Sequence, residues 1–378
     1  MVSFTQDIKE FALDLGYSKV GITSADGFPA YVEDLKSRYE MYAFYVEDPR
    51  HPMTGANPRH IMPGARSIIS VLYDYSKESF PHRLAGKIGR LYQARCNNAP
   101  EHRINGARPK LMREFLKKQG CQVGQGIFLP ERLTAARAGI VTFGRNAFAY
   151  AEDIGSFIFL SSFVVDVELD YDAPTIQEKC PPECTLCIEA CPTSAIYEPL
   201  KINPRRCIAF NTFRTQDGLP GGCSSYISPE LREKMGTWIH GCDICQEICS
   251  RNQKRLKTIL PPNAFLERIA EDFDLTKVLE MPEGFFDKRI QPVMYNFIKE
   301  EKYFQRNAAI AMGNTGDPGY IPALAKAMQD REELVRGYAA WALGRIGGNH
   351  ARQILEAGLA RETANSAKRE IEAALNIA

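Results

Sequence analysis

The sequence of 378 residues lacks several features that mark special classes of protein. No apolar run reaches the roughly 18–20 residues that a membrane-spanning helix needs. The first residues carry charges where a secretory signal peptide would carry its apolar stretch. The 47 basic residues nearly balance the 46 acidic ones, so the net charge of +1 gives no bulk attraction to nucleic acid or membranes. These absences predict a cytoplasmic protein without a membrane partner.

Cysteine, in contrast, is abundant. Eleven cysteines in a chain expected to stay in a reducing compartment indicate metal ligation rather than disulfides. Three of them, Cys96, Cys121 and Cys223, stand alone, which is typical of small buried apolar residues. The other eight fall into two dense groups.

Each dense group contains a C-x2-C-x3-C core that is preceded by one further thiol. The first group reads CPPECTLCIEACP, and the second ends in GCDICQEIC. This pattern is close to the bacterial ferredoxin run, in which the fourth thiol of each motif ligates the other cluster. The spacing predicts two 4Fe–4S clusters with these ligands: Cys180, Cys184, Cys187 and Cys249 for cluster 1, and Cys191, Cys207, Cys242 and Cys245 for cluster 2.

A pair of structural zinc sites is the alternative, because such sites also use C-x2-C pairs. Zinc ribbons carry two such pairs and no C-x2-C-x3-C-P run, so the pattern favours iron–sulfur clusters, whose iron binds soft thiolates. One spacing is unusual, since three residues separate Cys180 from Cys184 where ferredoxins usually have two, and Pro181 is among them. We expect this wider loop still to close.

The residues before the clusters predict helices interleaved with strands. Helices are expected from Phe4 to Leu15, ending at Gly16, and over RPKLMREFLKKQG, with Gly120 as its cap. Strands are expected over KVGITSA, over 65–75 and over 156–170, the last of which could contain a turn in its middle. This alternation predicts an α/β domain.

The C-terminal part has a different pattern. Ala308 and Gly313 in RNAAIAMGNTG recur as Ala339 and Gly344 in GYAAWALGRIG, an offset of 31. Alanine-rich helices at this period predict a HEAT-like repeat rather than two unrelated packing helices. From residue 300 onward the sequence has ten basic and ten acidic residues, so charge alone does not predict a nucleic-acid surface.

This order of parts resembles the cobalamin-dependent epoxyqueuosine reductases over nearly the whole chain. The resemblance is carried by RAGIVTFGRNAF (137–148), DIGSFIFLSSFVVDVEL (153–169), CTLCIEACPTSAI (184–196), RRCIAFNTF (205–213), IHGCDICQEIC (239–249) and VRGYAAWALGRIGG (335–348). It implies an α+β multi-domain fold. A nitroreductase-like α/β cobalamin-binding domain would span 1–170, a ferredoxin-like two-cluster module 171–255, and a helical HEAT-like repeat domain 256–378.

The resemblance also implies a function. In the family, a base-off cobalamin lies between the α/β domain and the clusters, and the epoxide oxygen of epoxyqueuosine in tRNA is removed there. The chain lacks the D-x-H-x-x-G motif that places histidine on cobalt in other cobalamin proteins, which fits the base-off state. The implied partners are tRNA, held through the HEAT-like tail, and an electron donor such as flavodoxin or ferredoxin. The cofactor-binding positions carried over from the family are Tyr92, Gln125, Asn146, Ala149, Leu160, Ala209, His240 and Gly241.

The chain departs from the family pattern around the expected substrate entrance. The family's aspartate proton donor falls on Gln125, a neutral amide that cannot deliver a proton as a carboxylic acid does. A basic position of the family falls on Gly55, and the connection between Cys207 and Cys242 is longer. Either another group supplies the proton, with Tyr92 and Cys223 as the first candidates, or the reaction differs. Without such a group, epoxyqueuosine reduction would be weak and Gln125→Asp would raise it.

Other functions remain open at this stage. Two clusters and a docking surface would suffice for a non-catalytic electron carrier, but the first domain would then have no role. A corrinoid-binding or corrinoid-reducing accessory protein would explain all three parts. Reductive dehalogenases share the core of the family without the tail and act on carbon–halogen bonds, so a dehalogenase-like enzyme with a divergent substrate is a further alternative.

Overall fold

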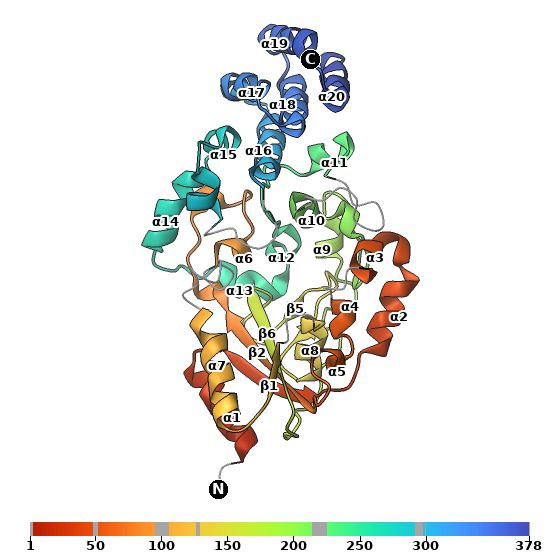
Figure 1. Ribbon diagram of the computed structural model, residues 1–378, viewed down its shortest axis with the longest axis vertical. Coiled ribbons are helices and arrows are strands. Elements are labelled where there is room, and N and C mark those ends of the chain that lie inside the picture. The colour runs from red at the N-terminus through yellow and green to blue at the C-terminus, as the bar shows by residue number, and fades with distance from the viewer. Residues whose placement is uncertain are drawn as a thin grey trace.

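The computed structural model describes residues 3–47, 52–94, 106–125, 129–213, 225–291, 298 and 300–377. Three parts follow one another along its long axis (Figure 1). A sheet with flanking helices lies at the end that contains the N-terminus, and a stack of helices lies at the end that contains the C-terminus. The cysteine-rich segments lie between these two parts. Within the described ranges, no helix combines the length and the apolar character of a membrane span.

A four-stranded antiparallel sheet forms the centre of the first part. Its strands lie in the order β1 (Lys19–Ser24), β2 (Ser67–Asp74), β6 (Ile158–Val165) and β3 (Val123–Gln125). β6 pairs with β2 over its full length, from Ile158 to Val165. The turn considered for the middle of 156–170 is therefore wrong. The run stays extended because every residue of β6 has a partner on β2.

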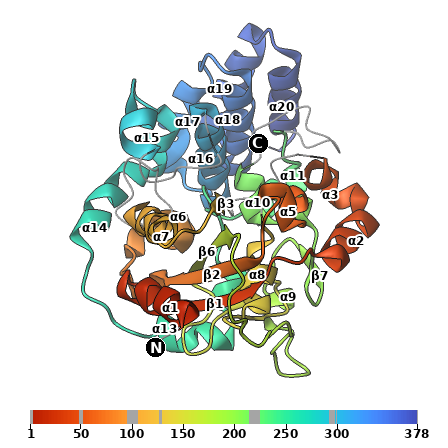
Figure 2. The ribbon, with the colours of Figure 1, turned by 60° about the horizontal axis from the view of Figure 1, so that its bottom comes forward.

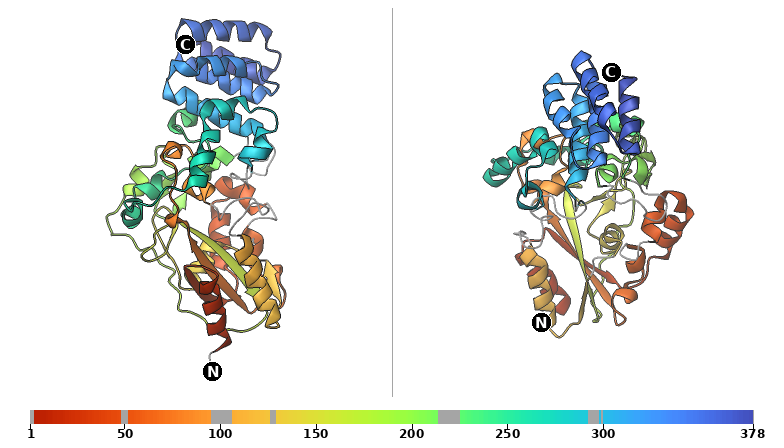
Figure 3. Two further views of the ribbon diagram at one scale, coloured as in Figure 1. Left: turned by 90° about the vertical axis from the view of Figure 1, so that its left-hand side faces the viewer. Right: turned by 45° about the horizontal axis from the view of Figure 1, so that its top comes forward.

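Different helices cover the two faces of this sheet (Figures 2 and 3). α1 (Phe4–Asp14) and α7 (Ala107–Lys118) lie on one face, where Ile8, Ile69 and Phe163 share a buried core. α8 (Glu131–Arg137) packs against β6, β2 and β1 from the other face. The start of α8 is thereby held beside β6.

The remaining elements of the first two parts are short. The first part also contains α2 (Pro29–Ser37), α3 (Tyr39–Val46), α4 (Pro52–Gly55), α5 (Pro58–Ile61), α6 (Arg90–Gln93), β4 (Thr142–Phe143) and β5 (Ala149–Tyr150). The cysteine-rich part contains α9 (Leu186–Glu189), β7 (Ile196–Glu198), β8 (Lys201–Ile202), α10 (Ile208–Phe213), α11 (Pro229–Lys234), α12 (Ile244–Glu247) and α13 (Gln253–Leu256). Because these elements are so short, few of them would be stable without tertiary contacts.

The tail is a stack of longer helices. They are α14 (Ala264–Ala270), α15 (Leu275–Glu280), α16 (Glu301–Thr315), α17 (Ile321–Ala327), α18 (Glu333–Ile346), α19 (Asn349–Arg361) and α20 (Asn365–Leu375). The repeated glycines explain their spacing. A Cβ on Gly313 would lie 2.9 Å from the Cα of Ala342, and one on Gly344 would lie 2.9 Å from the Cα of Ala374. Each glycine therefore lets one repeat helix contact the next closely.

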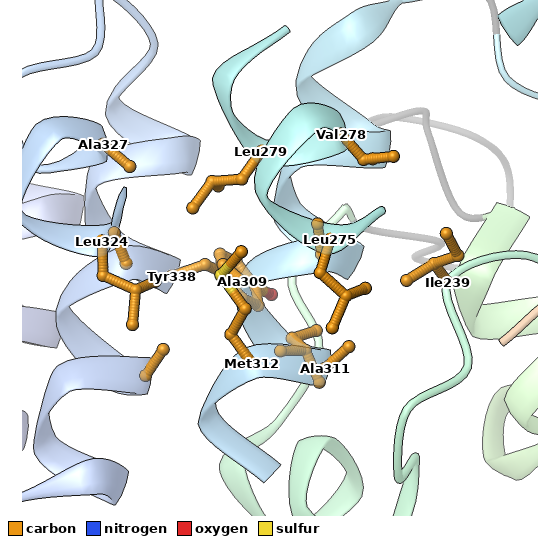
Figure 4. Packing of buried hydrophobic residues seen from close by; sticks show 14 of the residues in the cluster. Ile239, Leu275, Val278, Leu279, Ala309, Ala311, Met312, Leu324, Ala327 and Tyr338 are labelled. Carbon is orange, nitrogen blue, oxygen red and sulfur yellow. The ribbon is translucent and has the colours of Figure 1, made fainter. Parts of the chain in front are cut away.

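The tail and the cysteine-rich part share one continuous core. Ile239, which precedes the second thiol group, packs in the same cluster as Leu275 and Ala311 of the tail (Figure 4). Asn307 of α16 is buried and donates hydrogen bonds of 2.9 Å to the carbonyl oxygens of Thr212 and Ile239. The first repeat helix thus fixes the position of the backbone that leads into the second cysteine motif.

A buried ion pair gives a test of this attachment. Arg232 of α11 has a fully buried side chain and binds both carboxylate oxygens of Glu370 in α20 at 2.7 Å. We expect Glu370→Ala to lower the local free energy of unfolding by about 3–5 kcal/mol, because it leaves the guanidinium buried without its partner. Hydrogen exchange of the amides in α11 and α20 measures this change.

A more exposed pair between the same two parts is the matched control. Arg345 and Glu233 lie 3.5 Å apart with side chains 36% and 48% exposed, so Glu233→Ala should cost about 0–1 kcal/mol. Equal loss of protection in the two variants would contradict the assigned role of the buried pair.

Candidate redox centre and cofactor cavity

The first thiol group draws on both cysteine motifs. Cys180, Cys184 and Cys187 belong to the first motif, and Cys249 follows α12 of the second. Burial raises the pKa of the Cys187 thiol to about 11, and negative charge at Cys249, Cys180 and Cys184 adds to this effect. This electrostatic coupling fits the four thiols that the spacing assigns to cluster 1.

The thiols assigned to cluster 2 also come from both cysteine motifs. Burial raises the pKa of Cys242, and the charges of Cys207 and Cys191 raise it further. Burial also raises the pKa of Cys245, followed by the charges of Cys242 and Cys207, while Cys187 of the first group contributes as well. These electrostatic causes fit the four thiols assigned to cluster 2.

The chemistry of these groups fits two cubane clusters. All nine described cysteines are free, and eight of them form the two groups. Four thiolates held this close would repel one another unless cations lay between them, and the iron of a cluster supplies that charge. The unusual first spacing is accommodated by a turn, in which the Cys184 backbone N–H donates to the Pro181 carbonyl at 3.0 Å.

A hairpin of the first part holds both motifs in place. Arg145 and Asn146 lie between β4 and β5. The Arg145 Nη1 donates to the Cys184 carbonyl at 2.9 Å, and the Asn146 Nδ2 donates to the Cys245 carbonyl at 3.1 Å. Asn146 is buried and also donates to the Tyr150 hydroxyl at 2.9 Å. This predicted cofactor residue thus contacts the backbone of the second cysteine motif.

A large cavity opens beside the second thiol group. Its volume is about 790 Å³, and Cys207 and Phe210 form part of its wall. The other lining residues come from α2 and α3, from the start of α8, and from the segments around Phe143 and Glu178. None of the described lining residues is a histidine. A cavity of this volume could hold a large cofactor.

Three tyrosines form an aromatic side of the cavity. Tyr31, Tyr42 and Tyr45 come from α2 and α3, and burial raises the pKa of each hydroxyl. The Tyr42 hydroxyl donates to the Ile202 carbonyl at 2.6 Å, which connects α3 to the cysteine-rich part. The guanidinium of Arg38 lies 4.8 Å from the centre of the Tyr42 ring. This side is suited to flat, partly apolar groups.

One carboxyl group of the cavity stands out. Glu131 is the first residue of α8, and its Oε2 accepts a hydrogen bond from the Ser162 hydroxyl at 2.5 Å. Burial raises the pKa of Glu131 to about 7, although the hydrogen bond from Ser162 lowers it. Sequence reasoning missed this residue, because a glutamate in the first turn of a helix is ordinary and its burial depends on β6.

Several predicted cofactor residues lie away from the cavity wall. Ala149 and Leu160 pack in an apolar cluster with Ile140, on the side of the sheet that α8 covers. Ala209 adjoins Phe210, which lines the cavity, but is not itself a lining residue. The structure thus brings only one of these three positions next to the space that a corrin would occupy.

A layer of residues next to the second thiol group contains Tyr92, His240 and Gly241. The Tyr92 ring lies edge-on to His240, with 4.6 Å between the ring centres. A Cβ on Gly241 would collide with the ring of Tyr92. Burial raises the pKa of Tyr92, followed by the negative charges of Asp243, Cys207 and Cys242. Neither Tyr92 nor His240 is among the residues that line the cavity.

His240 is a buried, neutral ring. Burial lowers its pKa to about 3, and neither ring nitrogen has a hydrogen-bond partner among the described residues. The remaining predicted positions are less informative. Gln125 ends β3, where it pairs with Phe163 of β6, and Cys223 lies outside the described residues.

The shared thiol groups make a direct prediction. The chain should bind about eight iron and eight sulfide ions, as two cubanes require. Cys249→Ser should disturb the cluster held by Cys180, Cys184 and Cys187, because the spacing assigns Cys249 to that cluster and its charge acts on Cys187. Anaerobic iron analysis with electron paramagnetic resonance and Mössbauer spectra measures both.

The lone buried thiol Cys121 supplies the control, and Cys121→Ser should leave both clusters intact. If Cys249→Ser removed only the cluster ligated by Cys242 and Cys245, the exchange of thiols between motifs would be wrong. Bound zinc with little iron would contradict both clusters.

Two family models match parts of the chain. A model described as a 4Fe-4S double cluster binding domain matches residues 179–252. A model described as HEAT repeats matches residues 293–376. The iron–sulfur and HEAT-like interpretations of the sequence are therefore confirmed.

Complete proteins match the chain over nearly all its length. It is 28% identical to the epoxyqueuosine reductase of Bacillus subtilis (strain 168), over 98% of this chain and 95% of that one. It is 30% identical to the epoxyqueuosine reductase of Leadbetterella byssophila, over 67% of this chain and 81% of that one.

Solved structures show the same fold. A Bacillus subtilis epoxyqueuosine reductase with its catalytic aspartate loop swung out of the active site superposes with a TM-score of 0.81 at 27% identity, over 98% of both chains. An epoxyqueuosine reductase with a tRNA-Tyr epoxyqueuosine-modified stem loop gives 0.80 at 26% identity, over 98% of this chain and 97% of that one. By its fold, its cysteine motifs and these relatives, the chain belongs to the epoxyqueuosine reductase family.

Proposed function

We propose that this chain is a cobalamin-dependent iron–sulfur reductase that removes the epoxide oxygen of epoxyqueuosine in tRNA. The observation that carries the proposal is the position of the cavity. Cys207, a predicted ligand of cluster 2, forms part of the cavity wall. A cluster at this point could pass single electrons directly to a group bound in the cavity.

The two thiol groups form a route from the surface to this cavity. Beside the first group, Leu186 and Ile248 each precede a predicted ligand and are 43% and 42% exposed. Ile244, the equivalent of Leu186 in the second motif, packs against the buried core instead. We therefore infer that a flavodoxin or ferredoxin delivers electrons at cluster 1, and that cluster 2 passes them to the cavity.

The residues of the cavity fit a base-off cobalamin. Its wall has an aromatic side, a thiol of the second group and no histidine among the described lining residues. The corrin would contact Phe143 and Ala147 of the β4–β5 hairpin and Phe210, all of which line the cavity. When bound, cobalamin supplies a low-valent cobalt centre that is strongly nucleophilic toward carbon.

The tRNA substrate is supported by the retained tail. The helices of the tail pack in one core with the cysteine-rich part, so a stem loop bound there would be held at a constant distance from the cavity. The tail is balanced in charge, with ten basic and ten acidic residues from position 300 onward. Local contacts to phosphates, rather than an overall positive field, would then hold the tRNA.

The other functions fit the structure less well. An electron carrier has no use for a cavity of about 790 Å³ beside cluster 2. Reductive dehalogenases share the core but not the tail. A related reductase with a divergent substrate is the second candidate, because Gln125 stands where the family has its acid and the region of Gly55 also departs from the pattern.

Anaerobic reconstitution tests the proposal. We expect one cobalamin per chain, with a cobalt(II) resonance that lacks nitrogen splitting, because no described lining residue is a histidine. Epoxyqueuosine-modified tRNA and a low-potential one-electron donor should then yield queuosine, measured by mass spectrometry of nucleosides. The same tRNA with cobalamin-free protein is the control.

The possible failures of this experiment differ in meaning. A chain that never takes up cobalamin would favour the electron-carrier function. A chain that binds cobalamin but leaves epoxyqueuosine unchanged would favour a reductase of another substrate.

A further inference from the structure

We propose that Glu131 is the proton donor to the oxygen atom that leaves the substrate, a catalytic role that position 125 cannot fill in this chain. The proposal rests on the proposed function, since it concerns the epoxide reaction in the same cavity. It is argued from the place of the carboxyl group, from the absence of a cation that would hold it ionised, and from its hydrogen bond to Ser162.

The chemistry of the reaction requires an acid. Reduction of the epoxide to an alkene breaks both carbon–oxygen bonds, forms one carbon–carbon π bond, and releases the oxygen as water. The change consumes two electrons and two protons. The electrons come one at a time from the clusters, which an external low-potential donor reduces again. One proton must reach the oxygen as the first bond breaks, because an alkoxide is a poor leaving group.

Glu131 is placed to deliver that proton. It lines the cavity at the start of α8, and Leu129 and Pro130, which precede it, line the cavity as well. Ser162, to which it is hydrogen-bonded, is next to Phe163 on β6, and Phe163 pairs with Gln125. The carboxyl group of Glu131 is therefore held close to the strand end that would carry the acid in other members of the family.

The other charged groups of the cavity are already engaged. Asp34 forms an ion pair with Arg38, and Glu178 lies 3.3 Å from Arg145. Glu131 is the only carboxyl group among the described lining residues that has no basic partner. An unpaired, half-buried carboxyl group such as that of Glu131 is more easily protonated than a paired one, since no cation favours its ionised form.

The remaining titratable neighbours are poor acids. Burial raises the pKa of Tyr31, Tyr42 and Tyr45, so these hydroxyls hold their protons at neutral pH. Arg132 donates to the Ala147 carbonyl at 2.5 Å and stays charged. Cys207 is assigned to cluster 2. Among the described lining residues, no other group is thus placed to donate this proton.

The protonation state of Glu131 suits the task. Its pKa is raised to about 7, so a large share of the carboxyl groups carries a proton near neutral pH. General acids are most effective when their pKa lies near the working pH. After it delivers one proton, the group can recover another from solvent through the open part of the cavity. The second proton of the released water can be supplied in this way.

The test combines a titration with kinetics. In the cobalamin-free protein, infrared difference spectra should show a carboxyl group that titrates near pH 7, and Glu131→Gln should abolish this band. In the loaded enzyme, the single-turnover rate on epoxyqueuosine tRNA should fall as the pH rises through about 7, because the acid loses its proton. Glu131→Gln should lower this rate about 10²–10⁴-fold, with unchanged cobalamin uptake and cluster reduction.

Ser162→Ala separates a catalytic role from a structural one. The serine hydroxyl lowers the pKa of Glu131, so its removal should move the midpoints of the titration and of the rate profile upward together. Glu114 of α7 is exposed on the opposite face of the sheet, and Glu114→Gln is the control that should change nothing.

The outcomes are distinguishable. If the rate of the Glu131→Gln variant stayed within a few-fold of the wild-type rate, this proposal would be overturned and the proposed function would stand. The proposal would also be overturned if Ser162→Ala did not shift the midpoint of the titration and the midpoint of the rate profile together. A wild-type enzyme that binds cobalamin and converts no epoxyqueuosine would overturn the proposed function, and with it the role of Glu131 toward this substrate.

Discussion

The exchange of one thiol between the two cysteine motifs is the constraint on which the rest of the structure depends. The spacing predicts this exchange, and the electrostatics fit it, because the charge of Cys249 acts on Cys187 of the first motif and the charge of Cys191 acts on Cys242 of the second. Neither cluster site can therefore form unless both motifs are already in place. The β4–β5 hairpin holds both motifs in place, because Arg145 and Asn146 donate hydrogen bonds to one backbone carbonyl of each motif. Helix α16 of the tail holds the backbone before the second motif through buried Asn307.

This arrangement explains why the three parts act as one unit. The tail extends the apolar core of the cysteine-rich part, and the hairpin connects that part to the sheet. The cavity forms where the sheet part and the cysteine-rich part meet, with Tyr42 of α3 bonded to the Ile202 carbonyl across it. A cofactor in this cavity would be in contact with a cluster ligand on one side and with groups of the sheet part on the other.

The electrostatics of the cavity differ from those of the thiol groups. The thiols would be negatively charged as thiolate ligands, and iron would balance that charge. Among the carboxyl groups of the described cavity wall, Asp34 and Glu178 have basic partners and Glu131 has none. The wall thus contains both a predicted cluster ligand and a protonatable group. Reductive removal of an oxygen atom needs both, since the electrons and the protons must reach the same bond.

Much of the redox centre could be predicted from the sequence alone. Cluster ligation depends on the spacing of cysteines within short loops, so the two C-x2-C-x3-C cores indicated their grouping before any fold was known. The repeat of Ala308 and Gly313 at Ala339 and Gly344 indicated the helical tail for a similar reason, because helix packing has a short period. Three strands of the sheet followed from their apolar runs, apart from the turn considered within 156–170, whereas the short strand β3 was not predicted.

The cavity was decided by the tertiary structure. Its wall combines residues from α2, α3, α8 and the cysteine-rich part, which no local pattern connects. Tyr92 and His240 were expected at the cofactor but lie in a buried layer, and Glu131 was not expected at all. The physical reason is that a ligand spacing is a property of one segment of chain. The pKa of a carboxyl group depends instead on the solvent and the charges that distant segments remove or bring near it.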